Sequence, residues 1–429
     1  MPPGPLRGAL PSAEMAGPSR DLPLATPEPP AARWTVLWVA TLQQAGVTFV
    51  RFGLPALAPF FRSDLGLSLS QTGIVLGIFD LGAVLAFYLT GLLTRRFGER
   101  RVLAAGALLT GAVTVVAAST RGLWPLALLL AVAGAGFPSS HVAGTQAMVG
   151  WFPLRERGLA MGVRQSGLPV GGFVAAAVLP WLANALGWRA ALAIAGGACV
   201  SCGLVTYLAM PRSDGLDLPG PAADGGPLPR RQLVMATVTG SCLIFCQLAF
   251  TGYLPLYMVD EFGWERGEAA RLLLVVHTGG VAGRLGWGWL SDRTFRGQRV
   301  PPLLLVIAGG ALFLTALAFL DSAASVGWPV AAGMALAGGL TLLGWNALVS
   351  AQLAELAGPR TAQVMGLSLT SLFACSMVAP PLFGQAAESL GGYGPAWAAM
   401  IALQALAFVA ASQARLPAQA AAVGTQGPL

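Results

Sequence analysis

Long apolar segments alternate with short polar turns along most of the chain after residue 33. Each segment has roughly 20–28 residues, which is enough for a helix to cross a hydrocarbon core about 30 Å thick. Glycine and proline occur inside them, as membrane helices tolerate. The pattern predicts an all-α membrane protein with twelve transmembrane helices. The segments lie near residues 34–61, 71–93, 102–120, 123–150, 158–184, 188–211, 232–259, 268–290, 301–320, 325–350, 361–386 and 394–414.

Three stretches fall outside this pattern and divide the chain. Residues 1–33 are rich in Pro, Ala and Gly and lack an apolar core segment, so we expect a disordered cytoplasmic tail and not a signal peptide. Residues 212–231 are polar and Pro/Gly-rich, which is typical of a linker. They separate a predicted N-terminal bundle at 34–211 from a C-terminal bundle at 232–415. Residues 416–429 are expected to form a second cytoplasmic tail.

Arginines gather in alternate loops. The clusters at 95–101, 155–157, 212–231 and 293–299 all fall on one side of the predicted bundle. Because cytoplasmic loops carry the excess of basic residues, both termini are predicted to be cytoplasmic. The expected location is the cell (inner or plasma) membrane, with multiple passes.

Composition narrows the function further. Charged residues make up 10% of the chain and hydrophobic residues 55%, too few charges to cover the surface of a soluble protein of this length. The net charge of +7 is scattered between apolar runs, so no nucleic-acid partner is expected. The sequence has no Lys, which excludes a phosphate-binding G-x4-G-K-[ST] loop and Schiff-base chemistry. The five cysteines lie in apolar runs and are interpreted as packing residues, so neither a cofactor nor a metal is expected.

The two halves carry related sequences. Residues 91–98 (GLLTRRFG) follow the second span, and residues 288–297 (GWLSDRTFRG) follow the eighth, 197 positions later. The pattern Pro-x4-Asp at 59–64 matches 255–260 at an offset of 196. A duplicated unit predicts two pseudo-symmetric six-helix bundles, with an interface that can be exposed to either side.

These loops resemble the signature loop between the second and third helices of each half in the major facilitator superfamily. Residues 151–158 (WFPLRERG) and 167–172 (GLPVGG) are similar to that superfamily's fourth loop and fifth helix, and the resemblance covers about residues 34–415. The N-half loop departs from the pattern because Arg95 replaces the usual acidic residue. The residues to which the resemblance assigns a gating role are Gly91, Arg95, Arg96 and Gly98 in the first half, and Gly288, Asp292 and Arg293 in the second.

Six ionisable side chains stand out well inside predicted spans, where charge is costly and therefore a functional candidate. They are Arg51, Asp80, His141, Arg164, His277 and Arg284. At about 1.5 Å per helical residue, Arg51 and Asp80 lie ~15 Å and ~14 Å from the same membrane surface, so an ion pair between them is possible. His277 matches Asp80 in the repeat, and His141 follows a helix break expected at 134–138.

Arg164 and Arg284 each lie about 9 Å from a cytoplasmic helix end. The resemblance places their helices, the fifth and eighth, opposite each other across the halves, and guanidinium groups bind carboxylates in a bidentate fashion. Residues 283–293 resemble the eighth helix of the monocarboxylate and oxalate–formate branch, and 162–172 resemble cyanate-permease-like members. Both branches carry small anions, and the resemblance implies that Arg284 is the anion ligand. The dicarboxylate carriers have a basic residue in the eleventh helix and 361–386 has none, so a monoanion is favoured.

The candidate site therefore has two parts. Asp80 and His277 are the predicted proton-coupling residues, with Arg51 as the conformation-dependent partner of Asp80, and His141 is an alternative for the same role. Structural interpretations stay open for the same residues: a buried Arg51–Asp80 pair, arginines that reach the membrane surface, and a hydrogen-bonded His141. The predicted substrate-binding residues are Arg284, Arg164, Arg51, His141, His277, Gln247 and Asn346.

The predicted function is secondary active transport by alternating access, and not catalysis. The expected partners are a small anionic solute and the lipid bilayer, the expected state is a monomer, and proton coupling is a hypothesis. The alternative substrate class is hydrophobic, drug-like compounds moved by efflux. A haem-binding redox protein, with His141 and His277 as ligands, is an alternative from another class. An intramembrane hydrolase is disfavoured because the sequence has no H-E-x-x-H and no acidic pair in the spans.

Overall fold

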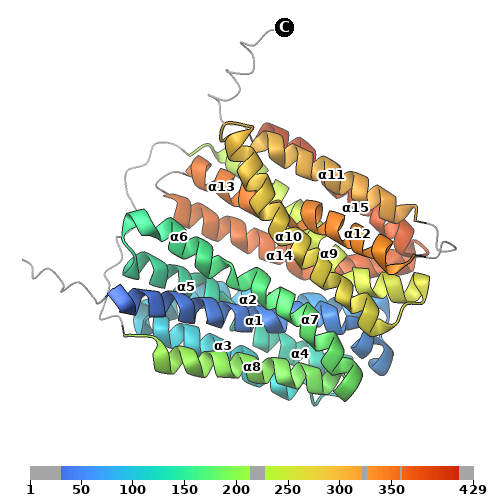
Figure 1. The fold of residues 1–429 in the computed structure, drawn as a ribbon, viewed down its shortest axis with the longest axis horizontal. Helices are drawn as coiled ribbons and strands as arrows, with labels where there is room; N and C mark the ends of the chain where they lie inside the picture. The colour runs from blue at the N-terminus through green and yellow to red at the C-terminus, as the bar shows by residue number, and fades with distance from the viewer. Residues whose placement is uncertain (1–29, 213–227, 321–325, 358–359, 415–429) are drawn as a thin grey trace, which may run out of the picture.

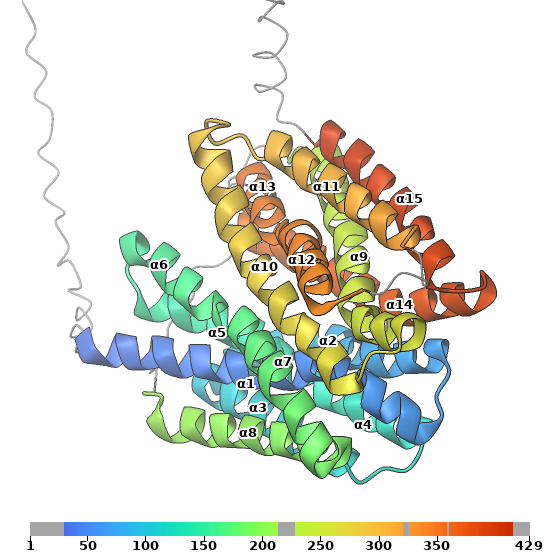
Figure 2. The same cartoon turned by 45° about the vertical axis from the view of Figure 1, so that its right-hand side comes forward.

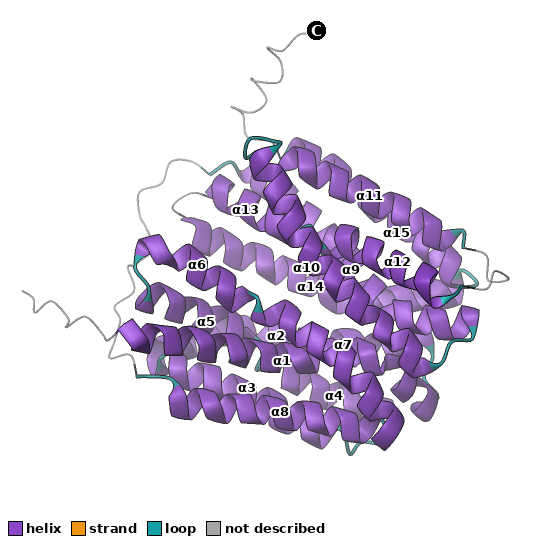
Figure 3. Cartoon of the chain, viewed as in Figure 1, coloured by secondary structure: helices purple, strands orange, loops and turns teal. Residues whose placement is uncertain are grey.

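The structure is a computed structural model that describes residues 30–212, 228–320, 326–357 and 360–414. Every regular element in this described part is a helix (Figure 3). The N-terminal half contains α1 (Pro30–Leu65), α2 (Leu69–Phe97), α3 (Glu99–Ala117), α4 (Leu123–Gly134), α5 (Pro138–Trp151), α6 (Leu154–Gln165), α7 (Gly167–Leu186) and α8 (Trp188–Ala209). The C-terminal half contains α9 (Arg230–Phe262), α10 (Arg266–Arg293), α11 (Val300–Ala318), α12 (Trp328–Gly338), the π-helix η1 (Gly339–Leu343), α13 (Asn346–Ala357), α14 (Thr361–Ser389) and α15 (Tyr393–Gln413).

The halves form two bundles, the first coloured blue to green and the second yellow to red (Figures 1 and 2). In the described part of the chain, ten helical segments are long and apolar enough to span a membrane. Three of them, Leu123–Trp151, Leu159–Leu186 and Trp328–Ala357, are each broken into shorter helices. The more polar α1 and α10 fall outside this set but pack against α7 like neighbouring members of a bundle. The fold is therefore consistent with the predicted twelve spans and confirms the fold class.

The first helix begins slightly earlier than the predicted start of the N-terminal bundle. α1 begins at Pro30, so residues 30–33, which we assigned to the disordered tail, are helical. Proline is compatible with a helix start because its missing N–H would have no intrahelical partner there. The rest of that tail, most of the 212–231 linker and the 416–429 tail lie outside the described residues.

Local sequence explains where several helices begin and end. Ser68 caps α2 in a capping box with Gln71, and Gly98 (φ 78°) lets α2 end and α3 begin within one residue. Gly297, in the matching loop of the second half, also has a positive φ of 82°. The break predicted at 134–138 is present, with Pro138 opening α5.

The halves meet along α2 and α14 and along α7 and α10. Glycines allow the first contact, because a Cβ at Gly73 would collide with the Pro380 carbonyl and one at Gly77 with the Met377 carbonyl. Polar contacts that join the halves gather toward one end of the molecule. Arg62 pairs with Asp260, the Ser70 amide donates to Glu388, and Asn184 donates to Glu265.

Candidate functional site

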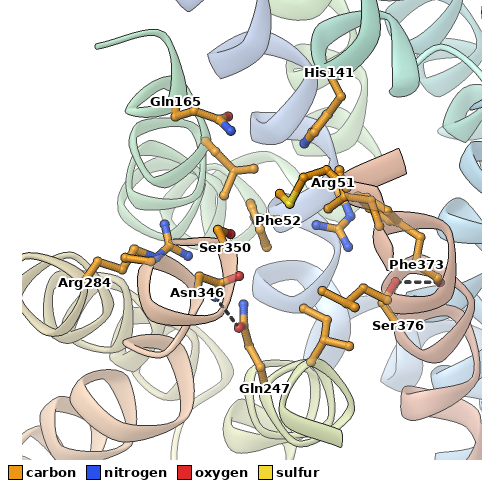
Figure 4. A pocket seen from close by; sticks show the side chains of 16 residues that line it. Arg51, Phe52, His141, Gln165, Gln247, Arg284, Asn346, Ser350, Phe373 and Ser376 are labelled. Atoms are coloured by element: carbon orange, nitrogen blue, oxygen red, sulfur yellow. Dashed lines mark hydrogen bonds between the residues drawn. The ribbon is translucent and has the colours of Figure 1, made fainter. Parts of the chain in front are cut away.

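A cavity of about 360 Å³ lies between the two bundles (Figure 4). Its polar lining comes from both halves, and apolar side chains from the same helices cover the remaining wall. The space therefore suits a small solute with one polar and one apolar part. The lining residues are Arg51, Phe52, His141, Gln165, Leu168, Ile244, Gln247, Arg284, Asn346, Ala347, Ser350, Met365, Leu369, Leu372, Phe373 and Ser376.

Arg51 and Asp80 form the ion pair whose possibility the sequence indicated. The Arg51 Nε donates to Asp80 Oδ1 and its Nη2 donates to Oδ2, both at 2.7 Å, in a bidentate arrangement. Both side chains are buried, with 9% and 2% exposure. The hydroxyl of Ser376, on α14 of the other half, donates to the same carboxylate. The positive charge of Arg51 is thus already balanced by a protein carboxylate.

Aromatic rings enclose this pair. The Arg51 guanidinium carbon lies 5.1 Å from the ring centroids of Phe52 and Phe137 and 5.5 Å from that of Phe373. Ring faces attract cations most strongly where water is displaced. Because the rings belong to α1, the α4–α5 break and α14, the cage spans both halves.

Arg284 has the opposite character. It lines the cavity from α10, its Nε is buried without a hydrogen-bond partner, and it makes no ion pair within the described part of the chain. Figure 4 shows it across the cavity from Arg51. A cation that no protein group satisfies is a ready site for an anion.

Close packing fixes the segment of α10 that carries Arg284. A Cβ at Gly283 would lie 2.7 Å from the Leu340 carbonyl oxygen, so only glycine allows this approach to η1. The same carbonyl accepts a hydrogen bond from Trp287 Nε1 at 2.9 Å. The Gly- and Trp-rich run around Arg284 is therefore a packing element that holds the arginine in place.

The structure places Arg164 away from the cavity lining. Its side chain is 1% exposed and lies inside the N-terminal bundle. Its Nη1 donates to Gln44 Oε1 at 2.7 Å and to the Ser140 carbonyl at 2.8 Å, and its Nη2 donates to Thr145 Oγ1 at 3.2 Å. Arg164 therefore does not reach the membrane surface in this structure, nor is it beside Arg284.

The two histidines occupy different places. His141 lines the cavity, with its Nδ1 3.1 Å from Ser140 Oγ. His277 is buried against Phe52, with ring centroids 5.4 Å apart, and a Cβ at Gly172 would lie 2.9 Å from its ring. His277 and Arg284 share the wall of a smaller cavity of about 10 Å³, next to the larger one.

Gln247 and Asn346, both predicted, line the cavity and contact each other. Asn346 Nδ2 donates to Gln247 Oε1 at 3.1 Å and to the Leu343 carbonyl at 3.3 Å. Sequence reasoning missed Gln165, Ser350 and Ser376. These side chains are uncharged, so the cost of burying a charge, which selected the arginines, Asp80 and the histidines, gave no signal for them. The position of Gln165 beside Arg164 was the one available indication.

The signature loops differ between the halves. In the second half, Arg299 Nη1 contacts Asp292 at 2.6 Å and its Nε donates to Glu355 at 2.9 Å, which links α10, α11 and α13. Gly288 and Arg293 lie at the end of α10, where the Arg293 guanidinium covers the Trp289 ring at 5.6 Å.

In the first half, Arg96 stacks beside Phe97, and Glu99 accepts from Trp151 Nε1 at 3.3 Å. Arg95 is exposed, and Gly91 has open space around it.

Comparison with known families decides the identity of this architecture. The model of the Major Facilitator Superfamily matches residues 40–380. This chain belongs to the major facilitator superfamily. It is a multi-pass membrane transporter and not an enzyme, as the sequence predicted.

Several relatives in this superfamily are similar over most or much of the chain. An uncharacterized MFS-type transporter of Mycobacterium tuberculosis is 29% identical over 86% of this chain and 82% of its own length. A protein of Cupriavidus necator named "Probable sulfoacetate transporter SauU" is 26% identical over 84% of this chain and 89% of its own. Monocarboxylate transporter 13 of Bos taurus is 27% identical over 62% of this chain and 63% of its own.

Solved structures show the same fold. A bacterial homologue of the human lysosomal transporter Spinster, in an inward-facing and occupied conformation, superimposes with a TM-score of 0.73. That comparison covers 94% of this chain and all of the other, at 16% sequence identity. The likeness supports the helical architecture.

Proposed function

We propose that this transporter carries a small organic monoanion by alternating access. The observation that carries the proposal is the charge balance of the cavity. Asp80 neutralises Arg51, whereas Arg284 has no partner within the described residues. Among the described residues that line the cavity, this leaves one unbalanced positive charge, which favours one negative charge on the solute. Arg164 also lacks a carboxylate partner, but it lies outside the lining and donates to neutral acceptors.

The cavity wall supports an organic solute. Leu168, Ile244, Leu369 and Leu372 cover the space between the polar groups. A carboxylate or sulfonate would bind the guanidinium fork of Arg284, and a short apolar part would contact these side chains. A relative named for monocarboxylates is consistent with this substrate class, whereas one named for sulfoacetate, a dianion, supports an organic anion without supporting a single charge.

Alternating access requires that the halves separate at one end while they close at the other. The Arg62–Asp260, Ser70–Glu388 and Asn184–Glu265 contacts hold one end closed. The arginine-rich loops that contain residues 95–101 and 293–299 lie at the other end. Because such loops face the cytoplasm, we assign the closed end to the outside.

The test is a ligand screen followed by substitution of Arg284. Purified protein is heated with acetate, lactate, benzoate or methanesulfonate, with the dianions malonate and sulfoacetate, and with the cation tetraphenylphosphonium. We expect stabilisation by at least one monoanion, and uptake or exchange of that monoanion in proteoliposomes. Stabilisation by the cation alone would overturn the proposal in favour of efflux of hydrophobic compounds, and stabilisation by none of these compounds would also overturn it.

Arg284→Lys keeps the charge but loses the fork geometry. We expect it to weaken binding of the selected monoanion by about ten-fold or more, because hydrogen bonds to charged groups contribute about 1.5–3 kcal/mol. Arg284→Ala should abolish saturable transport. Arg271→Ala is the matched control, since Arg271 is an exposed arginine on the same helix outside the cavity lining. Normal transport in Arg284→Ala would show that this arginine is not the ligand.

A further inference from the structure

A chain of hydrogen bonds connects buried Arg164 with the cavity. Arg164 Nη1 donates to Gln44 Oε1 at 2.7 Å, and Gln44 Nε2 donates to Gln165 Oε1 at 3.1 Å. Gln165 is exposed to the cavity and lines it, whereas Gln44 is fully buried. Figure 4 shows the Gln165 amide on the same side of the cavity as Arg284.

The donors and acceptors in this chain of hydrogen bonds follow from the chemistry of the guanidinium group. A guanidinium group can only donate hydrogen bonds, so the group of Gln44 that faces Arg164 must be its carbonyl oxygen. The NH₂ group of Gln44 then faces Gln165, which must accept through its own carbonyl oxygen. The NH₂ group of Gln165 is left for the cavity.

A second chain in the other half has a fixed direction for an equivalent reason. The Leu343 backbone carbonyl can only accept, so the Asn346 group 3.3 Å from it is the NH₂ group. That NH₂ group also donates to Gln247 Oε1 at 3.1 Å, which leaves the NH₂ group of Gln247 without a partner in the described residues. Gln247 is 5% exposed and lines the cavity opposite Gln165, from the other bundle.

We propose that the amide N–H groups of Gln165 and Gln247 bind the oxygens of the solute anion together with Arg284, and that Arg164 is a positioning residue that acts on Gln165 through Gln44. This inference rests on the proposed function and adds the class of the charged group. A set of donors from both halves suits an oxyanion that only accepts, such as a carboxylate or a sulfonate. Arg164 thus supports the anion without touching it.

Binding of one anion by residues of both halves would also couple occupancy of the cavity to closure of the two bundles around it. Gln165 belongs to the first bundle, whereas Gln247 and Arg284 belong to the second. A single oxyanion that accepts from both sides stabilises the arrangement in which the bundles are close. A ligand shifts a conformational equilibrium only by such differential contacts.

The direct test removes one donor from the cavity surface. Gln165→Met keeps the length of the side chain, removes the NH₂ group and disturbs no buried partner except Gln44. With the monoanion selected above, we expect the KM for exchange to rise about ten-fold, with little change in kcat. Thr145→Val is the matched control, because it removes another hydrogen bond of Arg164 that does not lead to the cavity. Its KM should stay within about two-fold of the wild type.

A double-mutant cycle tests whether Gln44 positions the Gln165 amide. Gln44→Leu should raise the KM in the wild-type background, because Gln165 loses its fixed orientation. In the Gln165→Met background the same substitution should have no further effect, because there is no amide to orient. A purely structural role of Gln44 would lower affinity equally in both backgrounds.

The outcomes separate this inference from the proposed function. Exchange of the monoanion that depends on Arg284 but is unchanged in Gln165→Met would overturn the amide donor and leave the proposed function intact. Additive effects of Gln44→Leu and Gln165→Met would overturn the positioning role of Arg164. If Gln44→Leu does not fold, Gln44→Met replaces it in the cycle, and the Gln165→Met result decides the donor role alone.

Discussion

At the scale of single residues, the buried carboxylate of Asp80 is sensitive to the position of the other bundle, because it accepts a hydrogen bond from that bundle. Its carboxylate accepts two hydrogen bonds from Arg51 and one from Ser376. Arg51 and Asp80 lie on α1 and α2 of the same half, so a rigid rocking motion leaves them paired. Ser376 lies on α14 of the other half, so its contact is the one that breaks when the halves separate. We therefore refine the hypothesis of proton coupling at Asp80. When the halves separate, Asp80 loses its hydrogen bond from Ser376 and keeps its ion pair with Arg51.

The corresponding prediction concerns Asp80→Asn in proteoliposomes. If Asp80 carries the coupled proton, accumulation driven by a pH gradient should disappear, whereas exchange at equal pH should survive. The substitution keeps the shape of the side chain and removes the group that titrates. Gradient-driven accumulation that persists in Asp80→Asn would exclude this carboxylate, and His277 would become the candidate to test next.

The ionisable residues of the site were the most predictable. Arg51, Asp80, His141 and Arg284 stood out because ionised groups are rare in spans, and the structure places Arg51, His141 and Arg284 on the cavity wall. Gln247 and Asn346 were also predicted and line the cavity, but uncharged polar groups are common in membrane helices, so no charge signal pointed to Gln165 and Ser376. The difference between paired Arg51 and unpaired Arg284 depends on tertiary contacts that spacing along the chain does not contain.

At the scale of helices, the contact between α2 and α14 depends on two small residues. Gly73 and Gly77 lie one turn apart on α2, and each faces a backbone carbonyl of α14. Small residues let backbones of membrane helices approach closely. Pro380 and Pro381 interrupt the hydrogen-bond ladder of α14 in the same region.

We predict that Gly77→Ala destabilises this arrangement of the halves. Its Cβ would collide with the Met377 carbonyl, and overpacking of this kind costs about 1–3 kcal/mol. The melting temperature of the detergent-solubilised protein should fall. Gly91→Ala, on the same helix, is the control, because an added Cβ meets nothing within 4 Å and alanine favours the helix. Equal melting temperatures for the two variants would contradict the close contact.

The helix breaks were predictable only where proline marks them. Pro138 identified the break between α4 and α5 in advance. The break at Ser166 is followed by Pro169, which cannot donate a hydrogen bond to the carbonyl of residue 165, whereas the π-helix Gly339–Leu343 contains no proline. The π-helix lies where one helix packs closely on another, because a Cβ at Gly339 would meet the backbone of α10 at Gly279 and Gly280. The close contact therefore explains the π-helix, for which the local sequence gives no cause.

At the scale of the whole molecule, duplicated loops and apolar segments predicted two bundles, and the structure contains them. The closed end was not predictable from sequence, because a transporter uses the same residues in more than one arrangement, and these differ by only a few kcal/mol. In this structure Asp260 marks the closed end, since it accepts from Arg62 of the other half and from Tyr393 Oη at 2.6 Å.

The last prediction tests whether this contact sets the balance between arrangements. Arg62→Glu would place two carboxylates together at a partly exposed site. An exposed ion pair contributes about 0.2–1 kcal/mol, and repulsion adds a similar amount, so the ratio of closed to open molecules should fall about two- to thirty-fold. Spin labels at Ser63 and Glu268, in a variant without the five native cysteines, report the separation of the halves at this end. We expect a longer distance population in Arg62→Glu. Reversing both charges, in Arg62→Asp with Asp260→Arg, should restore the short distance in part. An unchanged distance distribution in Arg62→Glu would mean that the glycine contact of α2 with α14 closes this end without help from the ion pair.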